Sequence, residues 1–219
     1  MELNRSINCR DIKKADVVGM DGEKIGNIGD FTFTFDGDLK LSQFILTGSV
    51  FEEFLEAIKA RPDKDPVFNS SMIKKLDDKV HLDTSRNGLK TTLDKGAISE
   101  DEIRLSTIEK LSIYDKNGIS IGKAIDVDFD VDGSASLIVG GGFFEEKLEA
   151  LGLKKDIDII VPGNVIEEIS DRIQLKVEKQ DLSLTMEEVV AETNVPSVRD
   201  SVATHREISK IRLYSHRPI

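Results

Sequence analysis

The fold of this chain is decided by a stretch that its sequence contains twice: Asp21-Gly22-Glu23-Lys24-Ile25-Gly26 and, 96 positions later, Asn117-Gly118-Ile119-Ser120-Ile121-Gly122. The correspondence continues at the same spacing, so that Phe33 matches Phe129. Farther along, the spacing shortens to 93, and the residues matched there are Ile73 with Ile166, Leu76 with Ile169, Val80 with Ile173 and Leu82 with Leu175. An internal repeat of this kind predicts two copies of one structural module.

Both copies have the sequence pattern of β-hairpins. Residues 31–35 alternate apolar and polar side chains, which is typical of a strand with one buried face. Asp36-Gly37 is a strong turn signal, and residues 39–46 form the expected returning strand. The second copy repeats this order, with strands expected at 127–131 and 137–139. The sequence therefore predicts a mainly β chain.

Short helices are expected after each hairpin. The apolar residues within 51–58 and within 143–151 are spaced to lie on one face of a helix. Two interpretations of these faces are open, because they could be docking grooves or could close the end of each sheet structure. Their presence in both copies favours closure. Residues 72–76 are expected to form a further helical turn, and residues 185–192 a helix.

The repeated motifs resemble those of the PRC-barrel family. The resemblance is carried by the turn-containing residues 18–33 and 113–129 and by residues 161–175, which follow the closing pattern of the family from Val161-Pro162 onward. The first copy has Phe68-Asn69 at the place of this Val-Pro pair. The resemblance implies two tandem small PRC-type β-barrels with short helices, followed by a partly helical C-terminal tail.

The repeat and the resemblance together give the expected domain organisation. Residues 1–85 form a first PRC-barrel-like domain, 86–103 a polar linker, 104–179 a second PRC-barrel-like domain and 180–219 the tail. Proteins of the PRC-barrel family mostly dock other proteins, and the fold has no general catalytic set. The family includes small archaeal proteins of the cell-division apparatus and a domain of a bacterial ribosome-maturation factor.

Four glycines are expected to have structural roles. Gly22 and Gly118 stand in tight turns, where a positive φ angle is needed and glycine adopts it without steric cost. Gly26 and Gly122 lie shortly after these turns, where they indicate a β-bulge or a sharp corner of the sheet. These motifs specify a fold and no chemistry.

Composition limits the partners and the compartment. The formal net charge is −11, and such a surface repels phosphate backbones, which argues against nucleic acid as a partner. The single cysteine, Cys9, fits a reducing cytoplasm. No stretch approaches the roughly 18–20 apolar residues of a membrane-spanning helix. We therefore expect a cytoplasmic protein.

The tail differs from the rest of the chain in charge. Residues 194–219 contain five basic and two acidic residues, a net charge of +3, which leaves −14 for the other residues. The tail could lie on its own acidic domains, reach for a partner or be disordered. We favour packing or interaction, because four residues are too apolar for a solvated tail: Ile208, Ile211, Leu213 and Tyr214.

One weak cation site is suggested by Asp128, Asp130 and Asp132, which begin like a calcium loop. The twelfth position of such a loop needs a bidentate glutamate, but here it is Val139. We therefore interpret the three aspartates as the acidic face of a strand and its turn. The three histidines lack the spacing of metal ligands. No cofactor is expected.

The sequence predicts a non-enzymatic adaptor that docks other proteins through its barrels and tail. Archaeal cell division is the specific process that the resemblance suggests, and a second copy of the chain is a further candidate partner. Two alternatives stay open, a small-subunit ribosome-assembly factor and a regulator that binds a small ligand or a cation. The basic tail leaves a route to RNA for the first alternative, although the −14 body argues against it.

Overall fold

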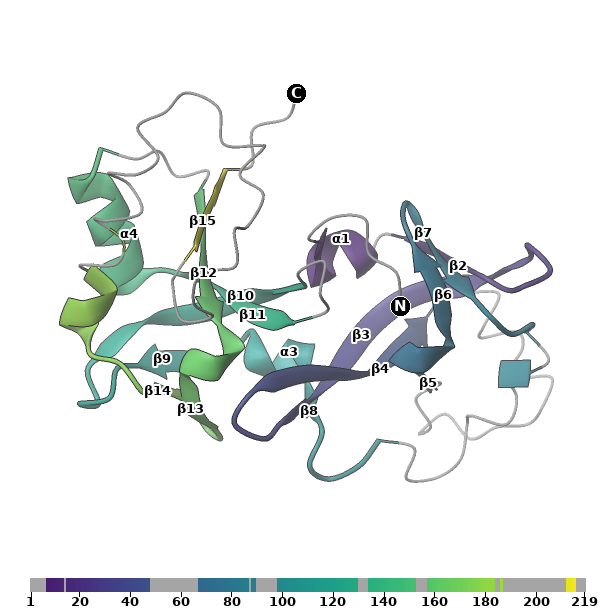
Figure 1. Ribbon diagram of the computed structural model, residues 1–219, viewed down its shortest axis with the longest axis horizontal. Helices are drawn as coiled ribbons and strands as arrows, with labels where there is room; N and C mark the ends of the chain where they lie inside the picture. Colours follow the sequence, from purple (N-terminus) through teal and green to yellow (C-terminus); the bar gives the residue numbers. More distant parts are fainter. Residues whose placement is uncertain are drawn as a thin grey trace. The chain divides into compact units, whose positions relative to one another are not determined.

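The computed structural model describes residues 7–13, 15–47, 67–86, 88–89, 98–129, 134–152, 157–183, 186 and 212–215. Most of them lie in β-strands, with short helices between the strands (Figure 1). The expectation of a mainly β chain with short helices is therefore confirmed. Within these residues, no helix combines the length and the apolar character needed to cross a membrane.

Internal contacts divide the chain into two compact units. Unit 1 comprises Met1–Phe35, Leu39–Ile108 and Val127–Ala135. Unit 2 comprises Asp36–Asp38, Glu109–Asp126 and Ser136–Ile219. Each unit contains most of one sheet.

The sheet of unit 1 is built around a long hairpin, in which β3 (Lys24–Phe35) pairs antiparallel with β4 (Leu39–Thr47). The strand order of this sheet is β5-β4-β3-β2-β7-β6. The pair β2–β7 is parallel, and the other pairs along this path are antiparallel. The other strands have the bounds β2 (Asp16–Val18), β5 (Val67–Asn69), β6 (Ile73–Leu76) and β7 (Lys79–Leu82).

The second sheet contains seven strands along its path, in the order β13-β14-β9-β10-β11-β12-β15. Strands β9 and β14 run parallel. The last residues of β10 and the first of β11 belong to unit 1, and the rest of the path lies in unit 2. The bounds are β9 (Ser112–Tyr114), β10 (Ser120–Phe129), β11 (Ala135–Gly140), β12 (Ile157–Pro162), β13 (Ile166–Ile169), β14 (Ile173–Leu175) and β15 (Arg212–Ser215).

The two sheets share one order of six strands. The path from β5 to β6 in the first sheet corresponds strand by strand to the path from β12 to β13 in the second. The parallel pair β2–β7 corresponds to the parallel pair β9–β14. The irregularities also correspond. The pair β6–β7 has a register shift between Ile73 and Lys75, and the pair β13–β14 has one 93 positions later, between Ile166 and Glu168. The backbone thus follows the repeat that the sequence contains.

Residues 72–76 were expected to form a helical turn, and this expectation is wrong. A short 3-10 turn, η1 (Ser70–Met72), is followed by strand β6. Ile73 and Leu76 are both buried, and the two lysines between them are exposed. The register shift after Ile73 explains this spacing, because a β-bulge adds one residue to the normal alternation of a strand. Apolar residues three apart therefore looked helical in the sequence.

The two expected post-hairpin helices have different outcomes. The second forms α4 (Gly142–Ala150), whose Phe144 and Leu148 are buried. This burial supports the interpretation that α4 closes the sheet structure of unit 2. The helix expected at 51–58 lies outside the described residues, as does the one expected at 185–192 except for Met186.

Phenylalanine side chains form the core of unit 1. The rings of Phe31 and Phe44 meet edge to face with centroids 5.2 Å apart, and Phe44 stacks on Phe68 at 5.1 Å. All three side chains are at most 1% exposed. Burying one such side chain contributes roughly 1.5–3 kcal/mol. These contacts connect β3, β4 and β5 into one packed layer.

A strand followed at once by a short helix precedes the sheet of each copy. The first βα segment consists of β1 (Ile7–Asn8) and α1 (Cys9–Lys13). The second βα segment consists of β8 (Ile103–Arg104) and α3 (Leu105–Ile108). The two segments are 96 positions apart, like the turns that follow them.

Each βα segment pairs with the other copy of the repeat. In the first segment, Ile7 lies opposite Phe129 of β10, and in the second, Ile103 lies opposite Phe33 of β3. These two pairings are equivalent at the spacing of 96. All four residues belong to unit 1. Unit 1 is therefore built from both copies, which exchange their first strands.

Candidate functional site

A strand from the C-terminal tail lies at the outer edge of the second sheet. Strand β15 runs antiparallel to β12, with Leu213 opposite Ile159. Tyr214 is the next residue of the same strand, whereas Ile208 and Ile211 lie outside the described residues. Two of the four apolar tail residues predicted to contact protein are thus placed in an edge strand. The tail was expected to be partly helical; residues 179–183 are helical, and β15 is an addition that the sequence analysis did not predict.

The strand that receives β15 is deeply buried. Ile159, Ile160 and Val161 of β12 are 1%, 2% and 0% exposed. Successive side chains of a strand point to opposite faces, so both faces of β12 are covered. A strand buried on both faces has the character of a central strand rather than of an edge.

A buried carboxylate in unit 2 holds the start of the helical segment that leads into the tail. Asp115 follows β9 and is fully buried. Its Oδ1 accepts hydrogen bonds from the N–H groups of Asn117 at 2.9 Å and Ile119 at 2.8 Å, which fix the turn before β10. Its Oδ2 accepts a hydrogen bond at 3.0 Å from the N–H of Lys179, where the helical tail residues begin. One side chain therefore connects the repeat turn to the helical segment that leads into the tail.

The protonation state of Asp115 follows from these contacts. Burial disfavours the charged carboxylate and acts to raise its pKa. The donated N–H groups, first of all that of Lys179, outweigh burial and hold the pKa of Asp115 below its usual 3.8. The carboxylate is thus charged at neutral pH and suited to bind backbone N–H groups.

The first copy makes the same turn without this attachment. Gly19 occupies the position equivalent to Asp115, and its N–H donates to the carbonyl of Glu23 at 2.9 Å as that of Asp115 does to Ile119. A Cβ atom on Gly19 would lie 2.7 Å from Oδ1 of Asp21. In this copy it is the carboxylate of Asp21 that accepts a hydrogen bond from a turn N–H, that of Glu23. The second copy therefore differs from the first by a carboxylate that binds the start of the helical segment leading into the tail.

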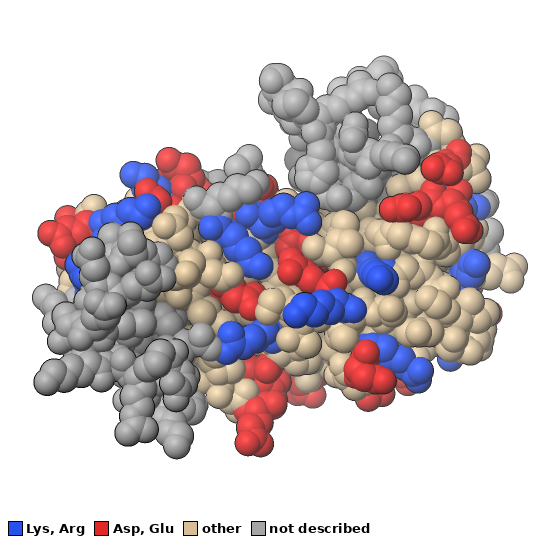
Figure 2. All heavy atoms as spheres, turned by 180° about the vertical axis from the view of Figure 1, so that it is seen from behind, with Lys and Arg blue, Asp and Glu red and all other residues tan. Residues whose placement is uncertain are grey.

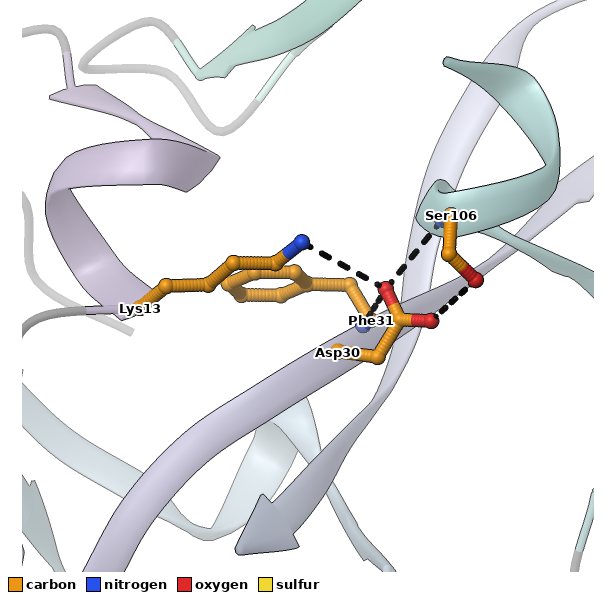
Figure 3. A network of polar contacts seen from close by, with 4 residues as sticks. All are labelled: Lys13, Asp30, Phe31 and Ser106. Carbon is orange, nitrogen blue, oxygen red and sulfur yellow. Dashed lines mark hydrogen bonds and ion pairs between the residues drawn. The ribbon is translucent and has the colours of Figure 1, made fainter. Parts of the chain in front are cut away.

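A second polar cluster, in unit 1, attaches the βα segments to β3 (Figure 3). Asp30 of β3 is 8% exposed, and its Oδ1 accepts a hydrogen bond from the N–H of Phe31 at 2.9 Å. The same carboxylate accepts the N–H of Ser106 at 3.3 Å and its hydroxyl at 2.6 Å. Nζ of Lys13 lies 3.9 Å from Oδ1. One carboxylate therefore contacts both α1 and α3.

Glu102 provides another attachment directly before the second βα segment. Its carboxylate accepts hydrogen bonds from the hydroxyl of Thr32 on β3 and from Nε2 of Gln43 on β4, the latter at 3.0 and 3.2 Å. The N–H of Gln43 in turn donates to Oγ1 of Thr32 at 3.1 Å. These polar atoms hold strands together, so we assign the cluster a structural role.

The glycines singled out in the sequence lie at turns and bulges. Gly22 and Gly118 have φ angles of 80° and 78°. The register of the pair β2–β3 is shifted next to Gly26, and the register of the pair β9–β10 is shifted next to Gly122. A Cβ atom on Gly122 would lie 2.7 Å from the carbonyl oxygen of Gly140. Position 122 therefore needs a glycine, because the backbone that leads into α4 passes too close for a side chain.

The three aspartates of the weak cation candidate are only partly described. Asp128 is 6% exposed and lies in β10 opposite Asn8. Asp130 and Asp132 lie outside the described residues. Within the described ranges, no group of three or more potential metal ligands gathers in space. The candidate stays a prediction from the sequence.

The arrangement in the second copy is that of a small, mainly β domain with one added edge strand. Its residues 100–182 match the family model of the PRC-barrel domain. The match spans the second βα segment, the strands β9 to β14 and the helical residues held by Asp115. The expected PRC-barrel resemblance is thus confirmed for the second copy. None of the curated proteins compared with the chain is similar to it.

The sequence analysis missed both βα segments and β15. A signal for the βα segments was present, because their apolar residues recur at the spacing of the repeat. These residues are Ile7, Cys9 and Ile12, followed by Ile103, Leu105 and Ile108. For β15 the apolar residues of the tail indicated packing, but nothing in their pattern indicated which edge they would join.

Proposed function

We propose that this chain is a non-enzymatic adaptor that docks other proteins through its PRC-type sheets and its C-terminal tail. The match of residues 100–182 to the PRC-barrel domain supports this function, because that family consists mostly of protein-docking modules. The observation that carries the proposal is the pairing of β15 with β12. Addition of an extended segment to a sheet edge is one of the general ways in which sheets bind proteins.

We further propose that residues 1–85 form a second PRC-type domain in addition to that of residues 104–179, with 86–103 as linker and 180–219 as tail. The shared order of six strands supports this duplication. We place the adaptor in an archaeal cytoplasm and in cell division. This placement is an analogy with the small archaeal members of the family, since fold alone does not determine function.

Charge supports protein partners over nucleic acid. The chain has a formal net charge of −11. On the face drawn in Figure 2, acidic and basic side chains are interspersed, whereas nucleic-acid sites gather basic side chains on one face. The ribosome-assembly factor and the cation- or ligand-binding regulator stay predictions from the sequence.

Cross-linking in cells followed by mass spectrometry tests the adaptor function. The full chain with an affinity tag should give reproducible cross-links to one or a few proteins, and the same proteins should co-purify from native lysate. Purification as a monomer with no protein partner would contradict the proposal. Co-sedimentation with small ribosomal subunits at moderate salt would instead favour the ribosome-assembly hypothesis.

A further inference from the structure

Strand β15 belongs to a sheet that is complete without it. The six-strand order of the first sheet ends at β5, and within the described ranges no strand pairs with β5 on the side away from β4. The equivalent strand of the second sheet is β12, which carries β15 on that side. The added strand comes from residues 212–215, far along the chain from the last helical residue of the tail that is described, Met186.

The edge of β12 requires an occupant. Its residues Ile159, Ile160 and Val161 are apolar and almost fully buried, and Asp158 is the one charged residue of the strand, so β12 has little of the charge by which natural edge strands avoid uncontrolled pairing. An empty β12 would expose a row of backbone N–H and C=O groups beside apolar side chains. The pairing with β15 covers this row from Ile157 to Ile160.

We propose that the edge of β12 is a docking site for an extended basic segment of a partner protein, and that β15 occupies this site when the partner is absent. The inference rests on the proposed adaptor function and names its docking site. Main-chain hydrogen bonds along β12 would supply the affinity, and the residues opposite β12 would supply the selectivity.

The tail itself indicates which segment fits. In register, Arg212 lies opposite Ile160 and Leu213 lies opposite Ile159. The surrounding tail has a net charge of +3, and the rest of the chain has −14. A partner segment with apolar residues between lysines and arginines therefore matches both the register and the charge of the site.

Tethering sets the conditions for exchange. A segment joined to its own binding site has an effective concentration on the order of millimolar. A free segment of similar affinity therefore competes poorly, and a partner must bind more tightly or engage a second surface. Weakening the tail strand should open the site to a free peptide.

A labelled synthetic peptide of residues 208–219 provides the direct test. The full chain with Leu213→Pro and Tyr214→Pro cannot pair along β15, because proline lacks the N–H that a strand donates. The peptide should bind this variant at least tenfold more tightly than the wild-type chain or the matched control Leu213→Val/Tyr214→Phe. A peptide whose lysine and arginines are replaced by glutamate should bind more weakly. Equal binding to all chains, or no binding to a folded proline variant, would overturn the proposal.

A cysteine pair gives a second measurement that does not depend on proline. In a Cys9→Ala background, Ile159→Cys and Leu213→Cys should form an intramolecular disulfide, because the two residues are directly opposite. Excess peptide should lower its yield. Disulfide-linked dimers as the main product would show that the tail of a second copy takes the site, which would overturn the choice of partner.

The outcomes for the docking site and for the adaptor function can be told apart. If cellular cross-links persist unchanged in the variants while the peptide fails to bind, the adaptor function stands and β12 is not its site. If the peptide binds but no cellular partner is found, β12 is a strand-accepting edge and the adaptor function fails.

Discussion

Phe33 and Phe129 stack on each other, with ring centroids 6.0 Å apart and an interplanar angle of 12°. They occupy the same position in the two copies of the repeat, and both are at most 1% exposed. Contact between equivalent residues is what a two-fold symmetric, self-complementary interface produces. Here the contact is made inside unit 1 of one chain, beside the exchanged βα segments.

The phenylalanine pair should contribute strongly to stability. We expect Phe33→Ala and Phe129→Ala each to lower the free energy of unfolding by about 3–5 kcal/mol, because each leaves a cavity in the core. The loss of unfolding free energy in the double variant should be smaller than the sum of the losses in the two single variants, by about 0.5–1.5 kcal/mol, because the ring contact is lost only once. Urea unfolding measures these values, with Phe33→Leu as a milder control. Strict additivity would contradict an energetic contact between the rings.

The carboxylate of Asp30 should be coupled to Ser106. Ser106→Ala removes the hydrogen bond that the hydroxyl donates to the buried carboxylate and keeps the one from the backbone N–H, so we expect the free energy of unfolding to fall by about 1.5–3 kcal/mol. Asp30→Asn and the double variant complete a cycle, whose coupling energy should exceed about 0.5 kcal/mol. Lys13→Gln is the matched control, because its longer and partly exposed ion pair should be worth less than about 1 kcal/mol. An effect of Lys13→Gln larger than that of Ser106→Ala would refute this assignment.

The contribution of Asp115 should depend on pH. Because its pKa is lower in the folded chain than its usual 3.8, Asp115 stabilises the fold above about pH 4, and this stabilisation is lost as the pH falls through the lowered pKa. We expect Asp115→Asn to cost about 1–3 kcal/mol at pH 7. The difference in melting temperature from the wild type should be constant from pH 7 to pH 5 and narrow below pH 4.

The variant Glu149→Gln, at an exposed position of α4, is the control for this titration. Its melting temperature should follow that of the wild type from pH 7 to pH 5. If the difference in melting temperature between Asp115→Asn and the wild type grew on acidification, it would contradict the role assigned to the carboxylate.

Two glycines should respond differently to alanine. A Cβ atom at position 118 would have no neighbouring atom within 4 Å. Gly118→Ala should therefore lower the free energy of unfolding by about 1–2 kcal/mol, because of the positive φ angle alone. Gly122→Ala places a methyl group against the carbonyl of Gly140 and the ring of Phe144, at 2.7 and 2.8 Å. The backbone before α4 must then move, so we expect a larger loss than for Gly118→Ala. Thermal unfolding of both variants decides the order, and a Gly122→Ala chain as stable as the wild type would disprove the steric argument.

The repeat made the main features of the fold predictable from the sequence. Turn glycines and period-two alternation are local signals, and they located the hairpins and α4 within a few residues. The β-bulge at Ile73 defeated the same logic, because it changes the spacing of buried residues in a way that imitates a helix.

The candidate site was less predictable, because it depends on pairing over long sequence separations. Periodicity identifies a strand but not its partner, so neither the exchange of Ile7 and Ile103 nor the pairing of Leu213 with Ile159 could be derived. The role of Asp115 was hidden for a related reason. Its second carboxylate oxygen accepts the N–H of Lys179, 64 residues later, at the very end of the second copy.

The pairing of Ile7 with Phe129 has a consequence for biosynthesis. The first strand of the chain emerges more than a hundred residues before the strand that it must join. At about 5–20 residues translated per second, that delay is roughly 6 to 25 seconds. During this time β1 has no strand to pair with, so a pause in translation of the second half of the message would delay the assembly of unit 1.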